Sequence, residues 1–203
     1  MRKLITLFLF LSFSTQGYSQ FFKDNKTVTK YEGYFTFYYD EGNDKIFLEI
    51  KNLDKEFLYV NSLSEGIGSN DIGLDRGQLG NTRVVKFIKA GNKLLLIQPN
   101  QYYRAITDNI EEKKSVEQAF AKSILKGFVI KETKNDKYLV DATSFFIRDA
   151  HGVMGRLSAK KQGKYSLDRS RSAVNLERTK AFPKNVEFDV MITFKGVPRG
   201  YDI

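Results

Sequence analysis

The absence of cysteine constrains how this chain can fold more than any other feature. Its 203 residues include no cysteine and a single histidine, His151. No disulfide can restrict the unfolded chain, and no thiolate can bind a structural metal. The fold must therefore depend on the burial of apolar side chains. With one imidazole and no HExxH, CxxC, GxSxG or GxxxxGK[ST] motif, the chain is not expected to form a complete zinc or triad active site.

The first nineteen residues have the pattern of a secretory signal peptide. The basic pair Arg2-Lys3 precedes an apolar run from Leu4 to Phe13, and Gly17-Tyr18-Ser19 places small residues before a cut at Gln20. The run is shorter than the about 18 apolar residues of a membrane span. We expect residues 1–19 to be removed on export, the protein to be secreted or periplasmic, and the mature chain to have no transmembrane segment.

The mature chain is predicted to form one domain made mainly of strands. We expect a flexible segment over residues 20–30 and a single β-rich domain over residues 31–203, truncated at its C-terminal end. Aromatic and β-branched runs alternate with turns rich in Gly, Asn and Asp, as in antiparallel sheets. The pattern predicts strands at 34–39, 45–51, 57–63, 83–89, 93–98, 128–132, 138–142, 144–148 and 186–195, with 102–106 as a further candidate.

One helix is predicted, over residues 112–126. Asp108 and Glu111 resemble a capping box, and Gly127 follows the last apolar position, where a helix-ending glycine is common. The apolar face is expected to pack on the sheet through three residues: Val116, Phe120 and Ile124. The predicted fold class is mainly β (α+β), an antiparallel sheet or sandwich-like domain with one amphipathic helix.

Positive charge gathers in one stretch, from Arg156 to Arg171. It holds six cations and a single acid, Asp168. Basic surfaces often contact nucleic acid or other anions, but no nucleic-acid motif accompanies this stretch. We expect an exposed, solvated loop here and no nucleic-acid partner.

A glycine-rich stretch, Ser64–Gly80, is the main candidate for a functional loop. It holds five of the fifteen glycines of the chain, which allow close backbone approach or left-handed turns. Two interpretations stay open: an ordered connection between strands, or a loop that lines a cleft or docks on another domain. The candidate interdomain or ligand-binding residues are Gly66, Gly68, Asn70, Asp71, Asp75, Arg76, Gly77 and Gly80.

The only histidine, His151, is a weaker candidate. A carboxylate at Asp141 or Asp149 could orient its imidazole. The alternative, which we favour, is a structural histidine that forms hydrogen bonds in a loop at the end of a strand. No residue of the chain is assigned a catalytic or metal-binding role.

Several of these segments together carry a family resemblance over about residues 30 to 200. The segments are Phe57–Ser64, Gly66–Gly80, Val84–Phe87, Leu95–Asn100, Leu139–Thr143, Arg148–Gly152, Ser170–Ala173 and Thr179–Asn185. In this order they resemble the N-terminal, non-catalytic domain of large secreted bacterial zinc-dependent metalloproteases, a domain of unknown function. The resemblance implies that the zinc site, an HExxH motif with a further histidine, lies in a separate C-terminal catalytic domain.

Three hypotheses follow for the role of the chain. The first is an accessory domain of a secreted zinc metallopeptidase, inactive alone, with the missing catalytic domain or a peptide substrate as its partner. The second is a self-standing secreted module that binds peptide or glycan, and the third is a decayed fragment. The chain itself is expected to bind no cofactor, and zinc is expected only in the missing catalytic domain.

Overall fold

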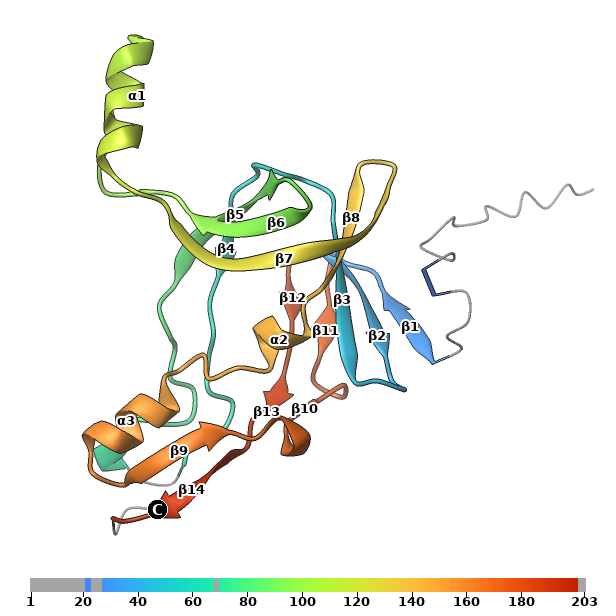
Figure 1. Ribbon diagram of the computed structural model, residues 1–203, viewed down its shortest axis with the longest axis vertical. Helices are drawn as coiled ribbons and strands as arrows, with labels where there is room; N and C mark the ends of the chain where they lie inside the picture. Colours follow the sequence, from blue (N-terminus) through green and yellow to red (C-terminus); the bar gives the residue numbers. More distant parts are fainter. Residues whose placement is uncertain (1–20, 23–26, 68–69, 201–203) are drawn as a thin grey trace, which may run out of the picture.

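A single antiparallel sheet of eight strands dominates the structure, a computed structural model that describes residues 21–22, 27–67 and 70–200 (Figure 1). The strand order is β1-β2-β3-β8-β7-β6-β5-β4, which confirms the predicted mainly β fold class. The strands are β1 (Val28–Tyr31), β2 (Thr36–Asp40), β3 (Lys45–Ile50), β4 (Phe57–Tyr59), β5 (Arg83–Ala90), β6 (Lys93–Gln98), β7 (Ser123–Lys134) and β8 (Lys137–Asp141).

Tight turns join the strands where the sequence predicts them. Gly91 has φ +59° between β5 and β6, and Asn135 and Asp136 have φ +50° and +57° between β7 and β8. Two-residue hairpin turns favour such left-handed residues because their backbone matches the twist of the paired strands. The predicted hairpin at 83–98 is therefore confirmed.

The core lies on one face of the sheet. Alternate residues of the strands point into it, and Phe37, Ile46, Val85 and Leu94 are fully buried. The rest of the chain crosses this face, and the ring of Phe188 packs against that of Phe37 in a tilted arrangement, with 4.9 Å between ring centroids. The covering elements are α2 (Thr143–Phe146), α3 (Val153–Ala159), β9 (Gly163–Leu167), η2 (Arg169–Arg171), β10 (Ala173–Val174), β11 (Lys180–Ala181), β12 (Val186–Glu187), β13 (Val190–Met191) and β14 (Phe194–Pro198).

The opposite face of the sheet carries a smaller apolar cluster near the N-terminus. Tyr38, Phe47 and Leu139 are buried there, with Phe22 and Val28 packed against them. Strand β1 begins at Val28, within the segment expected to be flexible. Ordered structure therefore begins before residue 31, the predicted start of the domain.

The predicted helix is wrong in its extent and in its packing. Helix α1 spans Ile110–Ala119, Asn109 caps its start, and none of its residues is buried. It projects from the β6–β7 connection away from the sheet (Figure 1). No helix in the described part of the chain is both long and apolar enough to cross a bilayer.

The residues assigned to the second half of that helix belong to strand β7. Gly127 pairs with Leu95 of β6 and does not end a helix, and the side chain of Ile124 is 61% exposed. The helix-like spacing that begins at Val116 holds only to the end of α1 at Ala119. From Ser123 on it is overridden by hydrogen bonding to the neighbouring strand β6, which a local pattern does not report.

Four further expectations are corrected. Residues 144–148 were predicted as a strand, but α2 occupies most of them, and the candidate strand at 102–106 is not formed. The predicted strand at 186–195 is divided among β12, β13 and β14. The basic stretch is not a loop, because it folds into α3, β9 and η2.

Candidate functional site

The glycine-rich loop is a closed extension of the β4–β5 hairpin. Beyond β4, the amide of Gly80 donates to the carbonyl of Asn61 at 2.7 Å, and Leu63 donates to Gln78 at 3.0 Å. Gly77 then donates back to the carbonyl of Leu63 at 2.7 Å. The two ends of the loop are therefore joined by backbone hydrogen bonds, which reduces the conformational freedom of the residues between them.

Two apolar side chains anchor the loop to helix α3. Ile72 and Leu74 are 3% and 1% exposed and form a separate cluster with Val153 and Leu157. The short 3-10 helix η1 (Asn70–Ile72) carries the first of them. Arg156 of α3 also donates to the backbone carbonyl of Gly73. The loop is thus held by burial and by a charge-assisted hydrogen bond.

At four positions of the loop the structure shows why the residue is glycine. A Cβ at Gly66 would lie 2.9 Å from the amide nitrogen of Arg76, closer than a carbon normally approaches. Gly73 and Gly77 have φ +70° and +80°, which other residues adopt only with strain. A Cβ at Gly80 would meet the side chain of Asn61 at 2.6 Å. Gly68 lies outside the described residues.

The charged residues of the loop remain on the outside. Asp71, Asp75 and Arg76 are exposed, and none of them makes a side-chain hydrogen bond or an ion pair with another described residue. The loop brings these predicted site residues together on one anchored segment that Asn70 opens at the start of η1. Such an arrangement can present both signs of charge to a partner in a fixed geometry.

The predicted pairing of His151 with a carboxylate is not found. The two carboxylate oxygens of Asp149 accept from the amides of Val153 and Met154, at 2.7 and 3.0 Å. Asp149 therefore caps the N-terminus of α3 and compensates its positive end. Asp141 accepts from the amide of Thr143 instead.

His151 has a buried but unsatisfied imidazole nitrogen. Its Nε2 is buried and has no hydrogen-bond partner among the described residues. The favoured interpretation of His151 as a hydrogen-bonded structural residue is therefore not supported at this atom. Neither carboxylate prepares the ring for acid–base chemistry, because both are engaged by backbone amides.

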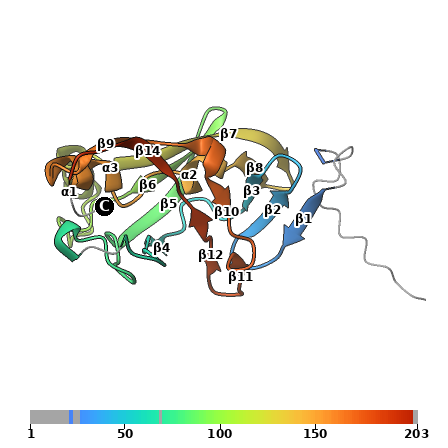
Figure 2. The same ribbon diagram turned by 90° about the horizontal axis from the view of Figure 1, so that it is seen from below.

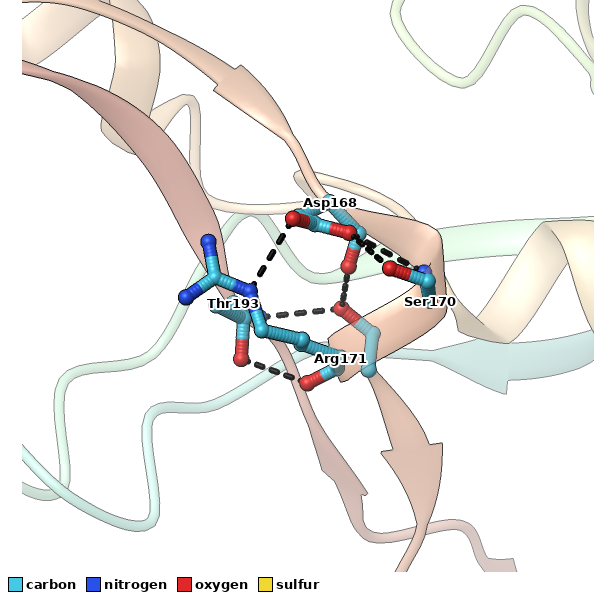
Figure 3. A network of polar contacts seen from close by, with 5 residues as sticks. Asp168, Ser170, Arg171 and Thr193 are labelled. Atoms are coloured by element: carbon cyan, nitrogen blue, oxygen red, sulfur yellow. Dashed lines mark hydrogen bonds and ion pairs between the residues drawn. The ribbon is translucent and has the colours of Figure 1, made fainter.

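Sequence reasoning missed a polar network around Asp168, which it counted only as the one acid of the basic stretch (Figure 3). Oδ1 of Asp168 accepts from the amide and the hydroxyl of Ser170, at 3.1 and 2.6 Å. Oδ2 accepts from Nε of Arg171 at 3.0 Å. The hydrogen bonds from Ser170 and Arg171 lower the pKa of Asp168 from 3.8 to about 2.

The same network ties η2 to Thr193, which lies in the chain between β13 and β14. The hydroxyl of Thr193 donates to the carbonyl of Arg171 at 2.6 Å, and the amide of Asp168 donates to the carbonyl of Thr193 at 2.8 Å. The spacing Asp168-x-Ser170 is the sequence signal, since an aspartate often accepts from the amide two residues on. The role of this network is structural: it fixes the turn from β9 to β10.

No metal centre is built in the described part of the chain. No group of three or more His, Asp or Glu side chains among residues 21–22, 27–67 and 70–200 is arranged to hold a metal ion. The absence of zinc from the purified chain stays a prediction, to be checked by metal analysis after dialysis.

Two protein-family models match the sequence. One, described as Domain of unknown function (DUF5117), covers residues 77–202, and the other, Domain of unknown function (DUF5118), covers residues 15–66. No curated protein and no solved structure matches the chain. Neither family description names an activity, so the link to metalloproteases stays a prediction.

The interval between the two matches falls inside the glycine-rich loop. The first match, up to residue 66, includes β1 to β4, and the second, from residue 77, includes β5 to β14. The docked tip, with Ile72 and Leu74, lies between them. The candidate site is thus the connection between the two matched regions.

Proposed function

We propose that this chain, which belongs to the DUF5117 family of domains of unknown function, is the N-terminal accessory domain of a secreted zinc-dependent metallopeptidase and is inactive alone. The segments between Phe57 and Asn185 that resemble such proteins, and that follow one another in this order, support this role. In this proposal the zinc and the catalytic residues belong to a separate C-terminal domain, and the present domain supports or shapes its substrate cleft.

One observation carries the proposal: the docked loop presents Asp75 and Arg76, whose side chains form no hydrogen bond or ion pair with another residue that the structure describes. The loop is anchored by Ile72 and Leu74, so its charged residues are held in place at little further entropic cost on binding. Arginine can form two parallel hydrogen bonds to a carboxylate, which suits a specific contact with another domain. The loop is therefore the surface that we assign to the junction with the catalytic domain.

The first experiment uses a full-length relative that carries the catalytic domain. The double change Asp75→Ala and Arg76→Ala is expected to lower peptidase activity about tenfold or more, the size of a lost interface anchor. The unfolding free energy of this domain should change by less than about 0.5 kcal/mol, because both side chains are exposed and unpaired.

A matched control is available on the connection before α1. Arg104 and Asp108 are also exposed, and the double change Arg104→Ala and Asp108→Ala removes the same two charges elsewhere. It should leave activity unchanged. If the loop double variant were as active as the control double variant, the loop would have no role in peptidase activity and would be only a structural connection.

A second candidate function, a self-standing peptide-binding module, is favoured by the open edge of the sheet at β4. The side chains of Leu58, Val60 and Leu79 are 72%, 46% and 65% exposed beside this edge. Edge strands are normally protected by charge, proline or a bulge. β4 is short, with three residues, but it carries no charge or proline, and the exposed apolar side chains beside it suit an extended peptide that adds as a further strand.

Two measurements separate the two functions. An open reading frame that continues into an HExxH segment in the gene would favour the accessory domain. Micromolar binding of a fluorescent peptide of alternating valine and threonine, lost in Leu58→Lys, would favour the binding module. Retained binding in Leu58→Lys would exclude β4 as the binding edge.

A further inference from the structure

The outer face of the β9–β14 ribbon is a basic surface. The two strands pair antiparallel, with Lys164 opposite Val197 and Ser166 opposite Lys195. Tyr165 and Phe194 alternate with these residues and pack inward against α3 and the glycine-rich loop. Because side chains alternate between the two faces of a strand, Lys164, Lys195 and Val197 share the outward face.

Further cations extend this face at one end of the ribbon. Lys160 and Lys161 lie in the turn from α3 to β9, and the amide of Arg199 donates to the carbonyl of Gln162 at the same end. Residues 153–167 and 190–200 together carry six cations and no acid. Figure 2 shows α3, β9 and β14 lying together at one end of the molecule.

The outward cations are not neutralised within the protein. Lys160, Lys161, Lys164, Lys195 and Arg199 are exposed, and none forms an ion pair with another described residue. Asp168 is the nearest acid along the chain; Arg171 pairs with it, and Lys195 is the one cation of this face close enough to help lower its pKa. The loop that carries Asp71 and Asp75 packs against the inward face of the ribbon. The outward face therefore keeps its positive charge.

We propose that this face, the β9–β14 ribbon with the α3–β9 turn, binds the surface of an anionic lipid bilayer. Four of its five unpaired cations are lysines, which are depleted in the cores of protein interfaces but are effective against anionic headgroups. Val197, 69% exposed, lies between the cations and can enter the headgroup region. The cations would contact the lipid phosphates, and Val197 would be buried just beneath that layer.

The first test measures partitioning of the purified chain onto vesicles of equal parts phosphatidylglycerol and phosphatidylcholine. Binding is expected at low salt and should weaken as salt screens the charges. Vesicles of phosphatidylcholine alone should bind the chain at least tenfold more weakly. The triple variant Lys164→Glu, Lys195→Glu and Arg199→Glu should lose at least tenfold in binding to the anionic vesicles.

A matched control separates the effect of the charges on this face from the effect of the net charge of the whole chain. The triple variant Lys51→Glu, Lys122→Glu and Lys131→Glu changes the same number of charges at exposed positions outside the ribbon. It is expected to keep its binding within about threefold when both variants are compared at about 0.1 M salt, where the effect of a charge falls off within a Debye length of about 10 Å. An equal loss in both triple variants would overturn the proposal.

A second test locates the contact directly. The chain has no tryptophan, so Val197→Trp introduces a single reporter. Its emission should shift to shorter wavelength on addition of anionic vesicles, whereas Leu58→Trp, at an equally exposed position on β4, should not shift. A shift at Leu58→Trp alone would place the membrane contact on the other edge and overturn the assignment.

Two other outcomes also decide against the proposal. Absence of binding of the unchanged chain to anionic vesicles at low salt would exclude the membrane. If that chain binds polyglutamate instead, and the ribbon triple variant does not, the face is a site for an acidic protein. Both results are independent of peptidase activity, so they leave the proposed accessory role untouched.

Discussion

At the scale of the residue, Asp168 shows how a single acid can organise a turn in a basic stretch. Both carboxylate oxygens accept hydrogen bonds, from Ser170 and Arg171, and the side chain is largely buried. The folded state therefore favours the charged form of this acid. Its contribution to stability is complete above the ordinary pKa of 3.8 and is lost as pH falls toward about 2.

We predict that Asp168→Asn changes the pH dependence of unfolding. The difference in unfolding free energy between the unchanged chain and the variant should be largest above pH 4 and should narrow as pH falls to 2, the interval set by the lowered pKa. Denaturant titration at several pH values measures it. Asp108→Asn, at an exposed position, is the control and should show no such narrowing. A difference independent of pH would contradict the prediction.

At the scale of the element, α1 shows that a helix can form without a core to pack on. Its start is stabilised by Asn109, whose side chain accepts from the amide of Glu111 at 2.9 Å. The aromatic ring at its end, Phe120, stacks on Tyr103 with 4.0 Å between centroids. An exposed helix of this length is only marginally stable by itself, so α1 contributes little to the stability of the sheet.

We therefore expect Phe120→Ala to lower the unfolding free energy by less than about 1 kcal/mol. Phe87→Ala is the matched comparison, because Phe87 is 3% exposed and contacts Phe35, Phe57 and Phe128. It should cost about 3–5 kcal/mol, the usual penalty for emptying a buried aromatic site. Similar losses in the two variants would mean that α1 packs on the protein.

At the scale of the whole molecule, the two family matches do not correspond to two separate sheets. The first match supplies β1 to β4, and these strands form both edges of the sheet, with β5 to β8 of the second match between them. Strand β3 pairs with β8, and β4 pairs with β5. The two regions therefore share one hydrophobic core.

This arrangement predicts that neither region folds alone. Residues 20–66 and residues 77–203, expressed separately, should lack a cooperative thermal transition, because each would expose half of the shared core to water. The intact chain should unfold in one transition, followed by circular dichroism and calorimetry. A separate, reversible transition for residues 77–203 alone would show that the second region is an independent domain.

The sequence by itself determined the strand-rich fold class and the clearest hairpin. Alternation of apolar residues and left-handed turn residues are local properties, so β5 and β6 with Gly91 between them could be predicted from the residues alone. The candidate loop was also recognisable, since its glycines are visible in the sequence. The sequence showed that Asp71, Asp75 and Arg76 were charged, but not whether they had partners.

The tertiary structure alone decided which segments pair and what each candidate residue contacts. Residues 123–125 continue the helical spacing of the apolar residues before them, but hydrogen bonding to β6 makes them part of a strand. Asp149 lies two residues from His151, yet its carboxylate oxygens accept hydrogen bonds from the amides at the start of α3 and not from the imidazole. The basic stretch becomes a single outward face only because β14 returns beside β9. These outcomes depend on contacts between distant parts of the chain, which the spacing of neighbouring residues does not encode.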